Sequence, residues 1–316
     1  MRNALSMLPM WSRRSRAAAA GLLAALCTCY PMTRARAYVR TRNANGTPIA
    51  WERSCVFLTS APATCPDGDP AAVAQAIRDS VAAWNDAADS CNATIHFELS
   101  ETDGSPEPGF DPKGKNENLI VWLTDHWGSG DTDYEPSAVA LTTLTYVTDE
   151  GAEDDGEILD ADIELNGVYQ HFTTNPVQPT SAYDVANTVT HELGHVLGLD
   201  HTCYDGSLPE RPTDDQGRPI PDCIPVVRLP PEVRNATMYP FASPGETSKR
   251  SLEPDDVKGV CGIYPPDRNA GPCEPIDLSD GCGCSSNPVQ DAPLWLLVAL
   301  AALAVRRRLP SSGRRS

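Results

Sequence analysis

The chain has 316 residues, with 25 Lys and Arg against 43 Asp and Glu, which gives a formal net charge of −18. This acidity argues against nucleic acid or an anionic membrane as the main partner, because phosphate binding requires a basic face. Eleven of the basic residues but only one acidic residue lie in 1–37 or 282–316, so the segment 38–281 holds 14 basic and 42 acidic residues, a formal charge of −28. An acidic body between two basic ends indicates a processed or targeted protein.

The N-terminal segment has the pattern of a secretory signal. Three arginines precede the small, apolar run 17–26, and Ala35-Arg36-Ala37 supplies the small-x-small pattern that signal peptidase reads. We therefore predict a cleaved signal peptide over 1–37, with Tyr38 as the first mature residue and the export machinery as a partner. A membrane anchor is the alternative, but the apolar run has about half of the roughly 20 residues that span a bilayer.

The segment between the two ends predicts one sheet domain with helices. Removing the ends leaves roughly 230 to 240 residues, enough for one well-buried catalytic domain or two small ones. Apolar residues at i+3 and i+4 spacing predict an amphipathic helix over 70–89, which begins after Asp69-Pro70. Strand character is found at 56–58, 94–99, 119–123, 138–147 and 158–165, and a last short helix is predicted at 252–259. This alternation predicts an α/β or α+β fold class.

The segment 38–281 holds seven cysteines, which in an exported protein predict disulfides rather than metal ligands. They are Cys55, Cys65, Cys91, Cys203, Cys223, Cys261 and Cys273. Cys55 with Cys65 and Cys203 with Cys223 are the easiest local closures, and the remaining three leave one odd thiol. The sequence does not settle the connectivity.

The stretch 191–201 carries the most specific motif in the chain. It reads His-Glu-Leu-Gly-His-Val-Leu-Gly-Leu-Asp-His, a complete H-E-x-x-H-x-x-G-x-x-H. Five specified positions at about one in twenty each give a chance match on the order of one in three million per starting position. Ser181 to Asp184 form a plausible capping box for the helix that carries the motif. Val185, Val189, Leu193 and Val196 line one face of that helix, so His191 and His195 project from the opposite face.

This motif predicts a catalytic zinc site. Gly198 can adopt the left-handed conformation that ends a helix, so that the chain turns and His201 returns as a third ligand beside His191 and His195. Three imidazoles leave one tetrahedral position on Zn²⁺ for water, which is typical of a catalytic site. Glu192 follows the first ligand directly, where its carboxylate can take a proton from that water and deliver it to a leaving amine.

The sequence around this motif resembles the metzincin metallopeptidases and, among them, the matrixins. The segments that carry the resemblance beyond the zinc motif are Thr202, the Met-turn-like Ala236-Thr237-Met238-Tyr239-Pro240, the final-helix-like 252–260 with Ile263-Tyr264, and the fifth-strand-like 159–164. The resemblance implies a metzincin fold over 38–265. Its parts are a mixed twisted sheet packed with two long helices, an active-site cleft, and a small C-terminal subdomain with Met238 as the apolar floor of the zinc site.

The same resemblance implies how a polypeptide substrate binds. An extended peptide adds antiparallel to an edge strand near 138–147, and its P1′ side chain enters a pocket behind His195, walled by the loop after Met238. The depth of this pocket depends on 241–250 and is not readable from the sequence. No propeptide with a zinc-blocking cysteine is visible after Tyr38.

Two further kinds of metal site are considered. We do not expect a second, structural zinc site, and calcium binding stays open. Many vertebrate matrixins have a histidine where Asp162 stands, so His126 and His171 lack the partner for a second, structural zinc site. Acidic residues can bind Ca²⁺ through carboxylate and carbonyl oxygens, and a solvated acidic loop is an equal alternative. The candidate calcium ligands are Asp131, Asp133, Asp154, Asp155, Asp160 and Asp162.

The C-terminal end predicts a sorting tail. A Pro-, Gly- and Asp-rich stalk is predicted over 266–291 and contains Gly281-Cys282-Gly283-Cys284, and 292–316 holds a short apolar helix followed by an arginine cluster. This arrangement resembles the MYXO-CTERM tails of myxobacterial exported proteins, which implies removal by a sorting protease and surface attachment through Cys282 or Cys284. Before processing, the tail places the chain at the membrane with the arginines in the cytoplasm. A simple tail anchor is the alternative.

Together these features predict a monomeric, secreted or surface-attached zinc endopeptidase acting on polypeptides. Two other functions stay open at this point. The first is a surface-displayed binding protein that keeps the metzincin scaffold without turnover. The second is a zinc enzyme acting on a non-protein amide, because zinc-activated water does not itself select the carbonyl.

Overall fold

The computed structural model describes residues 38–278, apart from positions 131, 178, 207 and 209, together with the two-residue strand β12 (Gln290–Asp291). The predicted signal peptide, the sorting cysteines Cys282 and Cys284, the apolar tail at 292–316 and the calcium candidate Asp131 lie outside the described residues. Within the described part of the chain, no helix combines the length and the apolar composition needed to cross a membrane.

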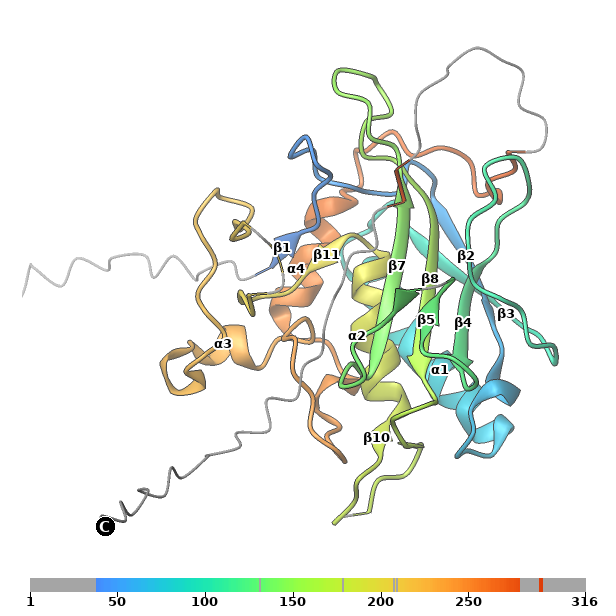
Figure 1. Cartoon of the computed structure of the whole chain (residues 1–316). Coiled ribbons are helices and arrows are strands. Elements are labelled where there is room, and N and C mark those ends of the chain that lie inside the picture. Colours follow the sequence, from blue (N-terminus) through green and yellow to red (C-terminus); the bar gives the residue numbers. More distant parts are fainter. Residues whose placement is uncertain are drawn as a thin grey trace, which may run out of the picture. The chain divides into compact units, whose positions relative to one another are not determined.

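A mixed five-stranded sheet forms the centre of the molecule (Figure 1). Its strands are β2 (Cys55–Ser60), β3 (His96–Glu101), β4 (Asn118–Leu123), β7 (Ala140–Tyr146) and β8 (Ile158–Asn166), in the spatial order β7-β8-β4-β2-β3. The strands β8, β4, β2 and β3 are parallel, and β7 is antiparallel to β8. β12 pairs only with the end of β7, at Thr145 and Tyr146. All five segments predicted to be strands therefore lie in this sheet, and the predicted α+β class is confirmed.

The helices that matter for the site are α1, α2 and α4. Their bounds are Pro70–Ser90 for α1, Val185–Val196 for α2 and Pro254–Ile263 for α4, as the sequence predicted to within a few residues. The shorter helices are η1 (Pro62–Thr64), η2 (Val226–Arg228), α3 (Pro231–Arg234) and η3 (Ser248–Arg250). Three short strand pairs complete the fold: β1 (Val39–Arg40) with β11 (Leu199–Asp200), β5 (Gly128–Ser129) with β6 (Thr132–Asp133), and β9 (Phe172–Thr173) with β10 (Tyr183–Asp184).

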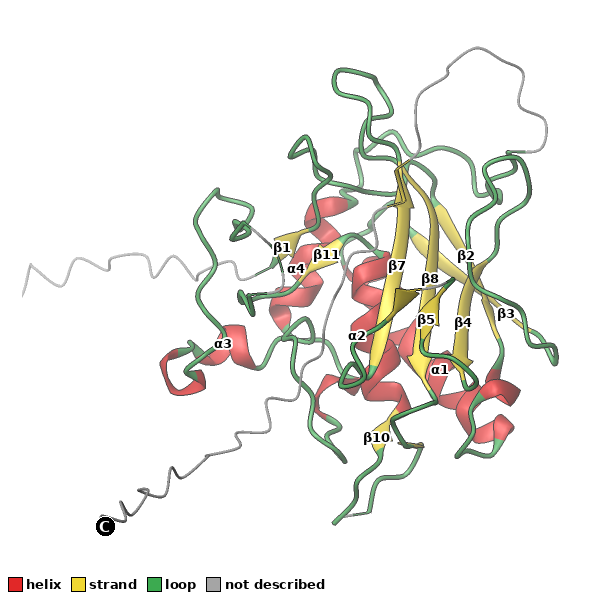
Figure 2. Cartoon of the chain, in the orientation of Figure 1, coloured by secondary structure: helices red, strands yellow, loops and turns green. Residues whose placement is uncertain are grey.

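The hydrophobic core lies between the sheet and the helices (Figure 2). Because side chains alternate along a strand, every second residue of β8 faces the helices, and Ala161, Ile163 and Leu165 are fully buried there. Ile77 of α1 and Leu193 of α2 are equally buried in the same cluster. The apolar side of the motif helix thus packs on the sheet, as its sequence pattern predicted.

Two tryptophans fix the position of α2. The indole Nε1 of Trp84 on α1 donates to the carbonyl of Thr190 at 2.8 Å, and that of Trp51 donates to the carbonyl of Val196 at 2.7 Å. Both tryptophans are 1–2% exposed, so their apolar rings also contribute to the core. The helix is therefore held at its middle and at its C-terminal end.

The N-terminal end of α2 differs from the predicted capping box. The N-cap is Asp184, whose side chain accepts a hydrogen bond from the amide of Asn187 at 2.8 Å, whereas Ser181 lies outside the helix. The Nε of Arg250 also donates to Asp184 at 2.7 Å, and its Nη2 forms an ion pair with the second oxygen. The capping-box prediction was wrong, because the helix begins at Val185 and Asp184, which also binds Arg250, is its N-cap.

We expect Asp184→Ala to lower the free energy of unfolding by about 2 to 4 kcal/mol, since it removes an N-cap and the charge-assisted bonds from Arg250. Urea denaturation measures this loss. Asp69 is a matched control, because it caps α1 by accepting a bond from Ala72 at 3.1 Å and has no ion pair within the described contacts. Asp69→Ala should cost about 1 kcal/mol. Equal losses in the two variants would contradict a stabilising role for Arg250.

Within the part of the chain that the structure describes, three disulfides connect segments that are mostly far apart in sequence. The pairs are Cys55–Cys273, Cys91–Cys261 and Cys203–Cys223, and Cys65 is free and buried. The predicted pair Cys203–Cys223 is confirmed. The predicted pair Cys55–Cys65 is wrong. Cys55 is the first residue of β2, and this start of the strand lies beside the segment that carries Cys273, 218 residues later.

Residues 266–278, predicted as the start of a stalk, lie against the domain. In addition to the disulfide of Cys273, the amide of Gly271 donates to the carbonyl of Glu52 at 2.7 Å, and Arg268 donates to the carbonyl of Trp51 at 2.6 Å. The folded body thus extends beyond the predicted boundary at 265. The other predicted divisions of the chain stay predictions.

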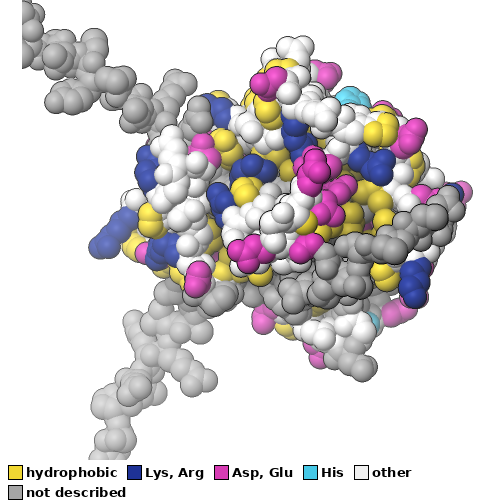
Figure 3. Space-filling view, turned by 90° about the horizontal axis from the view of Figure 1, so that it is seen from above, with side chains coloured by type: hydrophobic (Ala, Val, Ile, Leu, Met, Phe, Trp, Pro, Cys, Tyr) yellow, Lys and Arg dark blue, Asp and Glu magenta, His cyan; other side chains and the backbone are white. Residues whose placement is uncertain are grey.

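The surface agrees with the acidic composition. In the face seen in Figure 3, acidic side chains gather near the middle, with basic side chains spread around them.

Candidate metal centre

Helix α2 presents His191, Glu192 and His195 from the side opposite its apolar face. All three side chains are buried, with 0–3% exposure. A four-residue spacing places two side chains one turn apart on the same helix face, so the imidazoles of His191 and His195 lie together. Their ring centroids are 4.9 Å apart.

A glycine turn brings the third histidine to the same place. Gly198 has a φ of +82°, a left-handed conformation that side chains disfavour, and its amide donates to the carbonyl of His195 at 2.8 Å. The chain then enters β11, which pairs with β1, and reaches His201. The ring of His201 lies 5.4 Å from that of His191 and 5.0 Å from that of His195. The predicted turn at Gly198 is thus confirmed.

The nitrogen atoms that face one another have the spacing of ligands to one ion. The potential ligand atoms of the three histidines all lie within 4.8 Å of one another, and the Nε2 atoms of His191 and His195 are 3.3 Å apart. Tetrahedral nitrogen ligands about 2.0–2.1 Å from zinc lie about 3.3–3.4 Å from each other. The distance between the Nε2 atoms of His191 and His195 fits that geometry.

The hydrogen bonds on the far side of the rings determine the tautomers. Nδ1 of His191 lies 2.6 Å from the carbonyl of Thr237, and Nδ1 of His195 lies 2.8 Å from the carbonyl of Leu199. A carbonyl accepts only, so each Nδ1 carries the proton and each neutral ring has a lone pair on Nε2. Two lone pairs therefore face each other at 3.3 Å. Nε2 of His201 is also buried without a hydrogen-bond partner. The cluster can hold one zinc ion, which accepts all three lone pairs.

Burial keeps the three rings neutral. It holds the pKa of His191 and of His201 well below the ordinary value and lowers the pKa of His195 to about 4. The neighbouring cation Lys249 adds to the effect on each ring. A neutral imidazole is the form that binds a metal.

Glu192 lies on the sheet side of the cluster and contacts one polar residue of β7. The hydroxyl of Thr142 donates to Oε2 of Glu192 at 2.7 Å. Burial raises the pKa of Glu192 to about 7, while the bond from Thr142 and the charge of Lys249 act in the opposite direction. A carboxylate with a pKa near neutrality is suited to general acid–base chemistry. Local sequence pattern does not indicate Thr142, because the packing of the sheet brings it to Glu192.

The segment with Met238 lies beneath the histidines. Met238 is 1% exposed, and a Cβ on Gly194 of α2 would lie 2.3 Å from its sulfur, so the helix has a glycine where the thioether packs. Asp256 of α4 accepts from the amides of Thr237 at 3.0 Å and Met238 at 3.4 Å. The final helix therefore fixes the carbonyl of Thr237 that orients His191.

A buried lysine, which sequence reasoning missed, holds the chain after Met238. Lys249 is 3% exposed, and its Nζ donates to the carbonyls of Tyr239 at 2.6 Å and Phe241 at 3.1 Å. Its backbone amide donates to Asn187 of α2 at 2.9 Å. Burial lowers the pKa of Lys249 to about 8. Local pattern gives no signal for this residue, since it lies in a polar, Ser- and Thr-rich loop.

Among the described residues, no three of the candidate calcium ligands lie within ligand distance of one another. Asp133 is exposed beside His126, and Asp155 accepts from Asn43 and Thr47 in a separate loop. Asp154 lies in that same loop, and calcium stays a prediction. Among the described residues, a second group has its potential ligand atoms within 4.8 Å of one another: Cys55, Glu98 and Cys273. The sulfurs of Cys55 and Cys273 are joined in a disulfide.

The remaining candidates, Asp160 and Asp162, lie on the far face of the sheet with Glu164. Asp162 accepts from the amides of Gly109 at 2.7 Å and Leu119 at 2.9 Å. Burial raises the pKa of all three acids, that of Glu164 to about 7. Asp162 and Glu164 line a polar cavity of about 590 Å³. This cavity is separated from the histidines by the sheet.

The sequence matches no protein-family model, and no curated protein matches it. Among solved structures, the chain is similar to myroilysin, with a TM-score of 0.32 and 15% identity, over 68% of this chain and 82% of that chain. The interpretation of the site therefore depends on its own geometry.

Proposed function

We propose that this chain is an exported, zinc-dependent endopeptidase of the matrixin type within the metzincins. The observation that carries the proposal is the pair of Nε2 lone pairs of His191 and His195, 3.3 Å apart and fixed by carbonyls behind the rings. A cation between the two nitrogens would accept both lone pairs and remove their repulsion. Glu192 lies buried beside this position. The Met238 floor and the glycine turn, both part of the matrixin resemblance, support the assignment.

In this proposal the protein groups hold the metal and move one proton. His191, His195 and His201 bind zinc, which supplies a Lewis acid that activates water and polarises the scissile carbonyl. Glu192 takes the proton from the attacking water and delivers it to the leaving amine. Its Oε2 accepts from Thr142 at 2.7 Å, which leaves Oε1 for the transfer. Thr142 thus orients the base.

The proposed substrate is an extended polypeptide that adds to the outer edge of β7, along the part before Thr145. Three observations support this position. Among the described residues, the outer side of β7 is paired only at Thr145 and Tyr146, by β12. β7 runs antiparallel to β8 on its other side, and its Thr142 contacts Glu192. A peptide that pairs with β7 uses its own backbone groups, so affinity does not require one particular side chain. The segment after Met238, held by Lys249, is the proposed wall of the P1′ pocket.

Export is supported by the three disulfides, because such bonds persist in oxidising compartments. The proposal also includes the signal peptide, the export machinery and the monomeric state. It further includes a sorting protease that would remove the tail, with attachment through Cys282 or Cys284. Calcium binding is an optional part of it.

Metal binding and peptide cleavage together test the proposal. We expect the purified protein to bind one zinc ion and to cleave casein or a peptide library, and we expect chelation to abolish cleavage. At free zinc 1,000-fold above the dissociation constant, the metal should add about 4 kcal/mol to the free energy of unfolding. Calorimetry with and without chelator measures this gain. A protein that binds zinc stoichiometrically but cleaves no peptide would instead be a binding protein on the same scaffold.

A further inference from the structure

The third histidine differs from the other two in what lies behind its ring. Nδ1 of His191 and of His195 each faces a backbone carbonyl within hydrogen-bond distance. Nδ1 of His201 instead lies 3.9 Å from Oδ2 of Asp205, a carboxylate four residues later in the chain. The two side chains are only 5% and 10% exposed, so water screens their interaction weakly. No part of the zinc motif includes Asp205.

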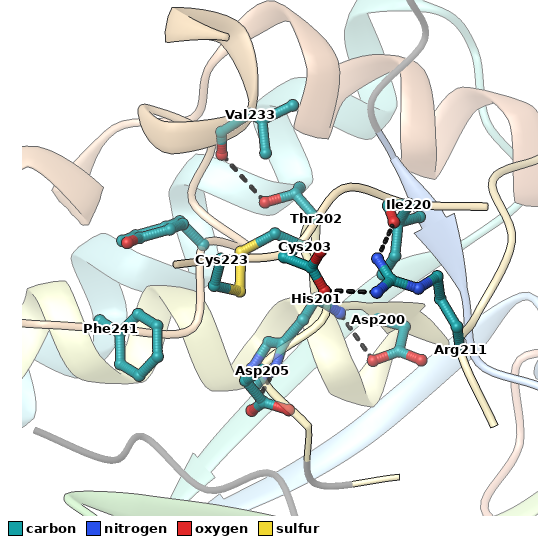
Figure 4. The surroundings of a disulfide bond; sticks show 12 residues. Asp200, His201, Thr202, Cys203, Asp205, Arg211, Ile220, Cys223, Val233 and Phe241 are labelled. Carbon is teal, nitrogen blue, oxygen red and sulfur yellow. Dashed lines mark hydrogen bonds and ion pairs between the residues drawn. A yellow bond between two sulfur atoms is a disulfide. The ribbon is translucent and has the colours of Figure 1, made fainter. Parts of the chain in front are cut away.

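The two residues just before Asp205 are held in place by neighbouring segments. Cys203 is bonded to Cys223, and both residues are buried. The amide of Tyr204 donates to the carbonyl of Pro221 at 2.8 Å, and the amide of Cys223 donates to the carbonyl of Tyr204 at 2.9 Å. Figure 4 shows Asp205 directed toward His201 from this loop. The backbone that leads to Asp205 is therefore held by the fold, and the Asp205 side chain is largely buried beside His201.

We propose that Asp205 is a positioning residue for His201 and that the Cys203–Cys223 disulfide holds it at that ring. The proposal depends on the zinc site proposed above. A negative charge behind the ring favours the tautomer with the proton on Nδ1, which leaves the lone pair of Nε2 for the metal. It also makes the ring a stronger electron donor to zinc. In this tautomer, the lone pair on Nε2 of His201 can bind zinc. That atom is buried and has no hydrogen-bond partner.

The charge of Asp205 has a second expected consequence. Three neutral imidazoles leave the full double charge of zinc uncompensated in a buried site. Glu192 and Asp205 are acidic side chains on different elements near the histidines, and each would offset part of that charge. Removal of Asp205 should therefore weaken metal binding without removing a ligand. Loss of an outer partner of this kind typically lowers metal affinity 10- to 100-fold.

The test compares Asp205→Asn with the wild type in a zinc competition titration against a chelator. We expect the dissociation constant for zinc to rise about 10- to 100-fold. Asp205→Glu keeps the carboxylate and should recover part of the affinity. The visible absorption of the cobalt-substituted protein should shift in Asp205→Asn, because the ligand field at His201 changes. A purely structural role would leave that spectrum unchanged.

Asp222→Asn is the matched control. Asp222 lies beside Cys223 on the segment paired with the Asp205 loop, but it is exposed and forms an ion pair with Arg211. Its replacement should leave zinc affinity within about twofold, since exposed ion pairs contribute little. Thermal unfolding of the metal-free proteins shows whether Asp205→Asn disturbs the fold itself. If it does, recovery of zinc affinity in Asp205→Glu decides in favour of the proposal, and absence of recovery overturns it.

The outcomes also separate this inference from the proposed function. Wild-type zinc affinity in an Asp205→Asn variant would overturn the role of Asp205 and leave the zinc peptidase intact. A wild-type protein that binds no zinc at the three histidines would overturn both.

Discussion

Replacement of Glu192 by Gln is expected to lower kcat/KM for peptide cleavage by about 10²- to 10⁴-fold, the contribution of a positioned general base. Gln has nearly the same shape as Glu and can still accept the hydrogen bond that Thr142 donates at 2.7 Å. It cannot take a proton from water at neutral pH. The three histidine ligands are unchanged, so zinc binding should persist. Cleavage of a fluorogenic peptide and a parallel zinc titration measure the two properties separately.

Glu164 provides the control for this variant. It is a second buried carboxylate whose pKa is raised by burial to about 7, and it accepts a bond from Thr143 as Glu192 does from Thr142. It lies on the opposite face of the sheet, so Glu164→Gln should leave cleavage within about twofold once any loss of stability is taken into account. Undiminished cleavage by Glu192→Gln would exclude Glu192 as the base and would favour a different proton acceptor.

The local parts of this site were predictable from the sequence. The i, i+4 spacing on a helix determines that His191 and His195 share a face, and Gly198 marks the turn that returns His201. These features depend only on residues within one turn or one loop of each other. The five strands were found for the same reason, since alternation and β-branched composition are local signals.

The parts that failed or were missed depend on long-range packing. Thr142 lies 50 residues from Glu192, and Cys55 lies 218 residues from Cys273. Asp184, the cap of α2, also accepts a hydrogen bond from Arg250, 66 residues later. A local pattern cannot distinguish the true partner from other residues of the same type. Cys65, for example, has the same chemistry as Cys273. Only the folded sheet determines which candidate comes close.

The second large effect is expected at Gly198, where the conformation of the chain determines the position of His201. An alanine there has to keep a φ of +82°, which costs about 1–3 kcal/mol for a residue with a side chain. Its Cβ would also lie 2.8 Å from the carbonyl oxygen of Ile49, a backbone atom that cannot rotate away. Overpacking of this kind costs about 1–3 kcal/mol. We therefore expect Gly198→Ala to lower the free energy of unfolding by about 2 to 6 kcal/mol and to weaken zinc binding.

Gly46 separates the two causes, because it has the same φ of +82° but no atom within 4 Å of an added Cβ. Gly46→Ala should show the conformational cost alone, and the excess loss in Gly198→Ala then measures the contact with Ile49. Since the carbonyl of Gly198 also accepts from the amide of Thr41 at 2.9 Å, relief of the contact would shift the end of α2 relative to β1. That shift would move His201 away from His191 and His195. Zinc affinity should therefore fall in Gly198→Ala and stay unchanged in Gly46→Ala, and equal affinity in both would show that the ligand does not depend on this turn.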